Sequence, residues 1–385
     1  QALSFSKFSA VQLLCLDDML PSPLTRPTRG GSSFAGSSWS TDATAGADSQ
    51  VSGHGRRSSS QLHRVSERPF AGTETDSSST SDEEGSVDDG RNSMAGEFEL
   101  GHAGHGRANS NSAEQGDAAL RASQERLKVA FDVGDVQPWE PSNFKLVRKI
   151  QDAPRSHGQV LHMIDVITGK DVAVKQIPNS WIRQQPEEFD QQHYGEGEHP
   201  WVGIGCAALL TNANYQYACP LLGVYRDEQT THIVMELAHE GDLFSWCHSP
   251  HVSVPGPERE TLVRPLARQI IQSLQQLHNL SIVHGDVSLE NIVLSGPLQI
   301  QLIDFGKSST SRFFRSGIRN KSSYAAPEMH TGEEFDGFLS DAFAAGVTLY
   351  ALLCNEYPWL STRPVCCKTF DYFCKNGFRA FIKKR

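Results

Sequence analysis

The chain changes abruptly in composition near Pro141, and this change limits which part of it can form a packed domain. Between about Pro21 and Gly116 the residues are mainly Ser, Gly and Asp, with few aliphatic side chains. Such a segment buries too little apolar surface to offset the entropy that it loses on ordering. We therefore expect residues 1–140 to be a disordered tail with short helical stretches, and the folded part to follow it.

Beyond this boundary the sequence shows two patterns in succession. Strand-like runs come first, in "FKLVRKI", "QVLHMIDV", "DVAVKQI" and "THIVMEL", and turn-forming stretches separate them. After Gly241 apolar residues recur every three or four positions in "ERETLVRPLARQIIQSLQQLHNL", which predicts a helix that starts near Pro265. These patterns predict an α+β fold with a small antiparallel β-rich lobe, a larger helical lobe and a ligand site between them.

Composition argues against several classes of function. The formal net charge of −10 disfavours binding to nucleic acid or to an anionic membrane. We find no apolar run of the length that a membrane span needs. The eight cysteines have no repeated spacing typical of metal or disulfide frameworks, which favours an intracellular, cytoplasmic protein. Ser59 follows two arginines, a pattern typical of phosphorylation sites, and the tail is a candidate site for a regulatory partner.

Four polar residues in the folded part have the chemistry of a nucleotide site. Asp286 and Asn291 lie in the loop "HGDVSLEN" between two apolar runs, and Asp304 follows a third run in "QLIDFGK". Lys175 ends the run "VAVK". Carboxylate and amide oxygens suit Mg²⁺, an ammonium neutralises phosphate, and a remaining carboxylate can take a proton from a hydroxyl nucleophile.

The same motifs, in the same order, resemble those of eukaryotic protein kinases. The motifs are "VAVK", "HGDVSLEN", "DFG", "YAAPE" and "SDAFAAGVTLYALL", and the resemblance extends from about Phe144 to Arg385. It implies that Lys175 binds ATP phosphates, that Asp286 is the catalytic base, and that Asn291 and Asp304 bind Mg²⁺. The last motif implies that Asp341 braces the catalytic loop.

The resemblance also implies contacts to the rest of the nucleotide. Met235 takes the place of the gatekeeper, and Glu236 and Ala238 in the hinge offer backbone groups to adenine. The other residues that the resemblance places against ATP are Gly158, Val160, Ala173 and Val293.

The motifs that surround the phosphates depart from the family pattern. The glycine-rich loop corresponds to "APRSHGQV", in which only Gly158 remains and Pro154 removes one N–H group. Arg155 could supply charge in place of the lost backbone groups, or lie in solvent. The helix glutamate that normally pairs with the lysine falls on Gly203, so the partner of Lys175 is left open among nearby glutamates and Asp304.

The catalytic loop departs from the pattern at two more positions. Gly285 replaces an arginine that typically docks a phosphorylated activation segment, which argues against that form of switching. Ser288 replaces a lysine that contacts the transferring phosphate, while Lys321 replaces the threonine that faces this lysine. One hypothesis is that Lys321 restores the lost charge, and the alternative is that Lys321 faces solvent.

Three functions follow, and the first is favoured because all four polar residues are retained. It is transfer of the γ-phosphoryl group of ATP, with Mg²⁺, to a serine or threonine of a protein substrate. The second is a pseudokinase that binds nucleotide or acts as a scaffold. The third is a small-molecule kinase of the aminoglycoside or choline type.

We expect the smaller lobe and hinge at 141–238 and the larger lobe at 239–385. The larger lobe is expected to lack its last helices and to expose Phe370, Tyr372 and Phe378.

Overall fold

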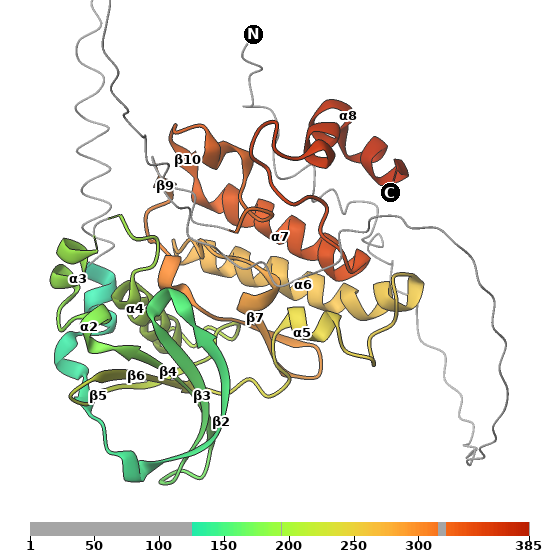
Figure 1. The fold of residues 1–385 in the computed structure, drawn as a ribbon. Coiled ribbons are helices and arrows are strands. Elements are labelled where there is room, and N and C mark those ends of the chain that lie inside the picture. Colours follow the sequence, from blue (N-terminus) through green and yellow to red (C-terminus); the bar gives the residue numbers. More distant parts are fainter. Residues whose placement is uncertain (1–124, 194, 315–320, 385) are drawn as a thin grey trace, which may run out of the picture.

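The protein has a strand-rich lobe and a larger helical lobe, as the sequence predicts (Figure 1). The structure is a computed structural model that describes residues 125–193, 195–314 and 321–384. The predicted α+β class is confirmed. The predictions for residues 1–124, including Ser59 and most of the tail, concern residues outside those described.

The smaller lobe is built on a six-stranded sheet with the order β1-β5-β6-β4-β3-β2. All neighbouring strands are antiparallel except β1 and β5, which are parallel. The strands are β1 (Gln137–Pro138), β2 (Phe144–Ala153), β3 (Gly158–Asp165), β4 (Asp171–Pro178), β5 (Leu221–Arg226) and β6 (Thr230–Glu236). The four strand-like runs correspond to β2, β3, β4 and β6, whereas β1 and β5 were not predicted.

Strand β4 sets the direction of the lysine because its side chains alternate between the two faces of the sheet. Val172 and Val174 are fully buried in a cluster with Leu161, Met163 and Val234. Ala173, which lies between them, and Lys175, which follows Val174, therefore point to the opposite face. This alternation turns the ammonium at the end of "VAVK" toward the helices and the larger lobe.

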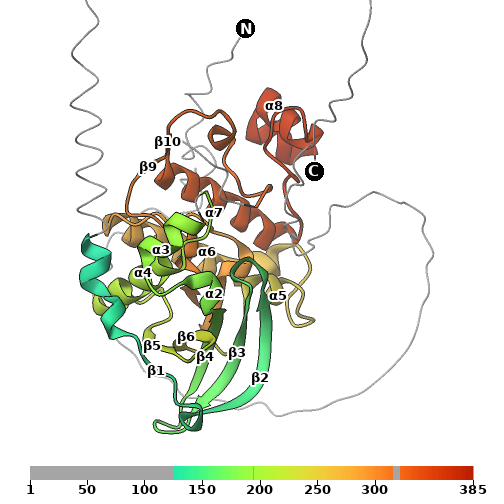
Figure 2. The same ribbon diagram turned by 60° about the vertical axis from the view of Figure 1, so that its left-hand side comes forward.

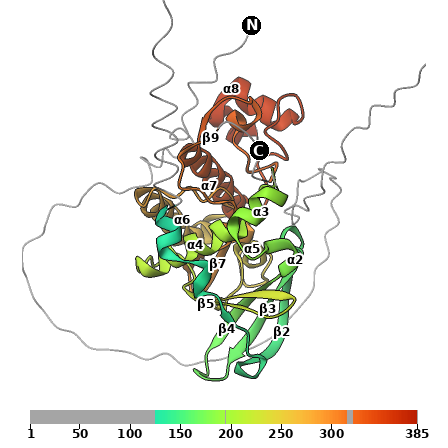
Figure 3. The same cartoon turned by 90° about the vertical axis from the view of Figure 1, so that its left-hand side faces the viewer.

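Three helices cover that face of the sheet, and Figure 3 shows α4 beside the strands and close to the larger lobe. They are α2 (Asn179–Ile182), α3 (Pro186–Gln192) and α4 (Pro200–Asn212). Ile182, Phe189 and Ile204 from these helices form one buried cluster with Ile177 of β4 and Ile233 of β6. The cluster fixes the start of α4 relative to β4.

The larger lobe has its core between two long helices, which cross its centre in Figure 2. Its helices are α5 (Leu243–Cys247), α6 (Pro257–Asn279), α7 (Gly337–Cys354) and α8 (Lys368–Lys384). Two short antiparallel strand pairs accompany them, β7 (Ile292–Gly296) with β8 (Gln299–Leu302), and β9 (Phe313–Phe314) with β10 (Phe335–Asp336). The catalytic-loop motif lies between α6 and β7.

Helix α6 does not start near Pro265, as the sequence analysis predicted, but at Pro257, so that Pro265 lies inside it. A proline within a helix removes one backbone hydrogen bond, so other contacts have to compensate. Arg259, which is fully buried, donates hydrogen bonds to the carbonyls of Leu352 and Ser253 and to the side chain of Asn355. These tertiary contacts hold the first turns of α6 in place.

The folded part begins before the predicted boundary at Pro141. Residues 125–130 form a helix, and Leu127 is buried against Gly205 of α4. Trp139 stacks on His232 with ring centroids 3.8 Å apart, and on Phe144 at 4.4 Å. The helix at 125–130 therefore packs against α4 and belongs to the folded part of the chain.

Two features of the last described helices differ from the sequence analysis. Helix α7 is long and apolar enough to cross a membrane, but 61% of that window is buried inside the larger lobe, as in a core helix. The prediction that Phe370 is exposed was wrong, because Phe370 is only 4% exposed and packs edge-on against Trp359. Phe378 is 40% exposed, and Tyr372 is partly buried.

Candidate functional site

The loop between α6 and β7 is held by one buried carboxylate. Asp341, on α7, accepts hydrogen bonds from the backbone N–H groups of His284, at 2.7 Å, and of Gly285, at 2.9 Å. It also contacts Nε2 of His278 at 3.0 Å. A buried carboxylate that accepts several N–H groups gives a rigid backbone, so the loop presents its next residue in a fixed position.

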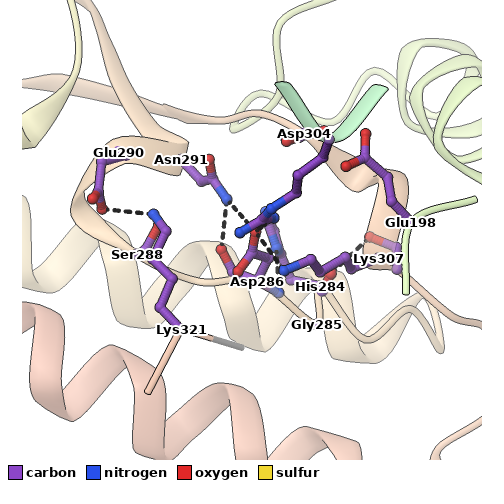
Figure 4. A network of polar contacts seen from close by, with 12 residues as sticks. Glu198, His284, Gly285, Asp286, Ser288, Glu290, Asn291, Asp304, Lys307 and Lys321 are labelled. Atoms are coloured by element: carbon purple, nitrogen blue, oxygen red, sulfur yellow. Dashed lines mark hydrogen bonds and ion pairs between the residues drawn. The ribbon is translucent and has the colours of Figure 1, made fainter. Parts of the chain in front are cut away.

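That next residue is Asp286, whose side chain is 3% exposed and surrounded by donors (Figure 4). Its Oδ2 atom lies 3.0 Å from Nδ2 of Asn291, 3.0 Å from Nη1 of Arg155 and 3.4 Å from Nζ of Lys307. Burial alone would raise the pKa of Asp286, but Lys307, Arg155 and Lys321 together lower it. The carboxylate is therefore held ionised, as a proton acceptor has to be.

A second cluster of charges lies around Lys175, which is inside β4. Its Nζ atom lies 3.1 Å from Oδ1 of Asp304 and 3.3 Å from Oε1 of Glu198. Burial opposes the charge of Lys175, but Asp304 and Glu198 raise its pKa. Burial alone would raise the pKa of Asp304, but Lys175, Arg155 and Lys307 lower it to about 2. Burial raises the pKa of Glu198, and Lys175 opposes this shift.

Glu198 answers the open question of the lysine's partner, because both it and Asp304 pair with Lys175. Glu198 comes from the loop before α4, and the N–H of the adjacent His199 donates to the carbonyl of Gly306 at 2.7 Å. At Gly203 a Cβ atom would lie 3.2 Å from the Gly306 backbone, so α4 approaches that turn closely. The carboxylate that pairs with Lys175 therefore comes from the loop before the helix, and a side chain at Gly203 would crowd the Gly306 turn.

The turn that replaces the glycine-rich loop carries a charge into the site. Pro154–Ser156 forms a short 3₁₀ turn, from which Arg155 reaches Asp286 with its side chain 27% exposed. The alternative of a solvated arginine is thus wrong for this structure. Packing requires glycine at position 158, since a Cβ there would lie 1.9 Å from the carbonyl oxygen of Gln176.

The other residues predicted to contact the nucleotide lie on strands around this point. Val160 pairs with Lys175 in the β3–β4 ladder, and Ala173 pairs with Met235 in the β4–β6 ladder. Val293 lies on β7, in the larger lobe. The last strand residue before the hinge, Glu236, uses its N–H for the carbonyl of Pro220. Ala238 follows two residues later, outside the strand. Their contacts to a nucleotide stay a prediction.

Lys321 is buried, so the alternative that it faces solvent is wrong. Its Nζ atom lies 3.1 Å from Oγ of Ser288 and 3.0 Å from Oε2 of Glu290 (Figure 4). The side chains at positions 288 and 321 are therefore in direct contact, as the hypothesis about Lys321 requires. The neighbouring Glu290 carboxylate neutralises much of the lysine charge.

Gly285, which replaces the family's arginine, is required by a close backbone contact. It has a φ of 75°, and a Cβ atom at this position would lie 2.4 Å from the carbonyl oxygen of Lys307. The contact joins the catalytic loop to the turn after Asp304. Any larger residue at 285 would have to separate the two.

We expect Gly285→Ala to lower the thermal unfolding midpoint more than Gly332→Ala. Both glycines have nearly the same positive φ, 75° and 74°, which costs a side chain about 1–2 kcal/mol. At Gly332 no atom lies within 4 Å of the added carbon, so only Gly285→Ala adds a collision. Thermal denaturation of both variants measures the difference. Equal midpoints would show that the contact between positions 285 and 307 is not needed for stability.

The donor set suits a magnesium ion that is shared with phosphate. Asn291 donates through Nδ2 to both the backbone oxygen and Oδ2 of Asp286, so its amide oxygen turns away from that residue. Asp304 offers a second hard oxygen in its carboxylate. Mg²⁺ typically takes one or two such protein oxygens, together with phosphate and water. Among the described residues there is no cluster of three or more His, Cys, Asp or Glu side chains for another metal.

The structure thus brings Lys175, Asp286, Asn291 and Asp304 together, and adds two residues that sequence reasoning did not select. Glu198 was one of several glutamates considered, and only the fold distinguishes it. Lys307 directly follows "DFG" and carried no recognised signal. The one clue to a role for Lys307 in the site was its positive charge three residues after Asp304.

Comparisons with known proteins agree with this geometry. A family model described as "Protein kinase domain" matches residues 156–371, more than half of the chain. The chain is 28% identical over 219 residues to "CBL-interacting serine/threonine-protein kinase 17" of Arabidopsis thaliana, covering 55% of this chain and 47% of that one. It is 27% identical over 206 residues to "NUAK family SNF1-like kinase 1" of Mus musculus, covering 53% and 29%.

A third relative has a shorter matched region. "Serine/threonine-protein kinase SIK2" of Gallus gallus is 31% identical over 156 residues, which cover 39% of this chain and 18% of that protein. In all three comparisons, the match spans less than half the length of the relative.

Proposed function

Because the chain belongs to the protein kinase family, we propose that it is an active enzyme that transfers the γ-phosphoryl group of ATP to a serine or threonine of a protein substrate. The relatives that carry "serine/threonine-protein kinase" in their names support the class of acceptor. The family match to a protein kinase domain also favours a protein over a small-molecule acceptor.

One observation carries the proposal, namely that two neighbouring charged clusters bring together residues of both lobes. Lys175 contacts Asp304 at 3.1 Å, and Asn291 contacts Asp286 at 3.0 Å. Arg155 joins the clusters, since it contacts Asp286 and its charge acts on Asp304. A triphosphate and its magnesium ion need this combination of cations and hard oxygens at one point.

In the proposed reaction the substrate hydroxyl lies against Asp286. The hydroxyl oxygen forms a bond to the γ-phosphorus while the bond from that phosphorus to the bridging oxygen of ADP breaks. Asp286 orients the hydroxyl and takes its proton. Lys175, held by Glu198, neutralises phosphate charge. Asn291 and Asp304 would hold Mg²⁺, which supplies electrostatic stabilisation of the phosphates when bound.

Arg155 is proposed to replace the backbone groups of the lost glycine loop. Its guanidinium contacts Asp286, and phosphate oxygens would compete for the same guanidinium. In this proposal the adenine and sugar lie against Val160, Ala173, Met235, the hinge at Glu236 and Ala238, and Val293.

The ion pair between Arg155 and Asp286 also favours a second candidate, a kinase-like protein that binds nucleotide without transferring phosphate. The contact covers the carboxylate on which transfer depends. A chain in which Arg155 stays on Asp286 when nucleotide is bound would be such a module. Nucleotide binding with no transfer is its expected signature.

The test is transfer of labelled γ-phosphate by the full chain to a generic protein acceptor and to itself, with and without Mg²⁺. Binding of ATP is measured in parallel by calorimetry. Magnesium-dependent transfer supports the enzyme, whereas binding without transfer to any protein acceptor supports the second candidate. Absence of both would reject the nucleotide site altogether.

A further inference from the structure

The catalytic loop of this chain lacks a positive charge at the position where many serine/threonine kinases carry one. Ser288, two residues after Asp286, stands where many serine/threonine kinases have a lysine that contacts the transferring phosphate. Negative charge spread over the transferred group needs a fixed cation nearby, and removal of such a group is costly in rate. The proposed reaction therefore requires a replacement.

Two buried lysines lie close to this loop, and their surroundings differ. Lys321 has a carboxylate partner, Glu290, 3.0 Å away, and it also contacts Ser288. Lys307 approaches the proposed base itself, with Nζ 3.4 Å from Oδ2 of Asp286 (Figure 4). Of the two, Lys307 is closer to the point where the substrate hydroxyl would lie.

The backbone around Lys307 is fixed by contacts with the catalytic loop. The hydroxyl of Ser308 donates to the carbonyl of His284 at 2.9 Å, and Val283 and Ser309 exchange two backbone hydrogen bonds. The carbonyl of Lys307 lies against Gly285, where a Cβ atom would collide with it. With its side chain only 8% exposed, Lys307 is held in place before any ligand binds.

The position of Lys307 also relates it to the proposed metal ligand. Lys307 ends the 3₁₀ turn Phe305–Lys307 that begins directly after Asp304, while its ammonium contacts Asp286. A γ-phosphoryl group between Asp286 and Asp304 would therefore lie close to the ammonium of Lys307. No other described lysine contacts the proposed base.

We propose that Lys307 is a catalytic residue that contacts the transferring phosphoryl group, in place of the lysine that the catalytic loop lacks. The inference rests on the proposed function, because it assigns a role within the same reaction. It differs from the role of Arg155, which comes from a more exposed turn and is proposed to bind the nucleotide phosphates. Loss of Lys307 should therefore lower kcat, whereas loss of Arg155 should raise KM for ATP.

The test compares four variants of the full chain in steady-state phosphoryl transfer. Lys307→Met removes the charge at nearly constant length, and Lys307→Arg keeps it. A third variant combines Lys307→Met with Ser288→Lys and Lys321→Thr, which returns the charge to the family's position. Arg155→Gln is the comparison for a nucleotide-binding cation. Thermal midpoints and ATP affinity are measured for each.

We expect Lys307→Met to lower kcat on the order of 100-fold with a KM for ATP within a few-fold of the original. Lys307→Arg and the relocated-charge variant should each recover at least tenfold of that loss. An unchanged kcat in Lys307→Met would overturn the inference. So would a loss that neither rescue variant recovers, because the side chain would then act by packing alone. If the unaltered chain transfers no phosphate, the proposed function itself fails.

Discussion

Asp286→Asn is expected to lower kcat for phosphoryl transfer by about 10²–10⁴-fold while leaving ATP affinity within a few-fold of the original. The amide keeps the shape of the side chain but cannot take the proton of a hydroxyl. Because Asp286 is proposed to orient the substrate hydroxyl and not to bind the nucleotide, its charge is expected to matter more for transfer than for the binding of ATP.

Asp304→Asn is the partner experiment, and its expected result is different. Asp304 holds Lys175 and offers the hard oxygen for Mg²⁺, so its loss should weaken magnesium-dependent ATP binding as well as transfer. Calorimetry with ATP, with and without Mg²⁺, separates the two variants. Equal ATP affinities in both would contradict the assignment of base and metal ligand.

Glu198→Gln is expected to lower kcat/KM for ATP by about 10–100-fold, because Lys175 loses one of the two carboxylates that position it. Asp304 remains as a partner, so the lysine stays charged and the chain should stay folded. The expected change is a shift of the ammonium toward Asp304, away from the nucleotide phosphates.

The matched control for this prediction is Glu196→Gln, two residues earlier in the same loop. Glu196 is exposed, whereas Glu198 is 7% exposed and contacts the lysine. Transfer by Glu196→Gln should therefore equal that of the unaltered chain. Equal rates for both variants would show that Lys175 does not need Glu198, and Asp304 alone would then position it.

The sequence predicted the parts of the site that depend on short motifs. Lys175 lies on a strand with alternating side chains, and Asp286, Asn291 and Asp304 lie in short segments before β7 or after β8, so local pattern was enough to find them. The strands β2, β3, β4 and β6 were found for the same reason, because alternation of side chains is a local property.

What the sequence could not predict depends on contacts between distant residues. Glu198 pairs with Lys175 from the loop before α4, while α4 packs closely against Gly306 at Gly203, the position where a glutamate was expected. The helix α6 extends past Pro265 because Arg259 is anchored on the end of α7. In both cases tertiary packing overrides a local preference, and no spacing rule contains that information.

The first described residues of the chain have a practical consequence for shortened versions of this protein. A fragment cut at Pro141, where the composition changes, would lack Leu127, the strand β1 and the indole of Trp139 between Phe144 and His232. Such a fragment would leave the outer strand β5 unpaired on one side, and would open to water the ring faces of Phe144 and His232 that Trp139 covers. Expression trials should therefore begin upstream of residue 125, since a cut chosen from composition alone invites aggregation.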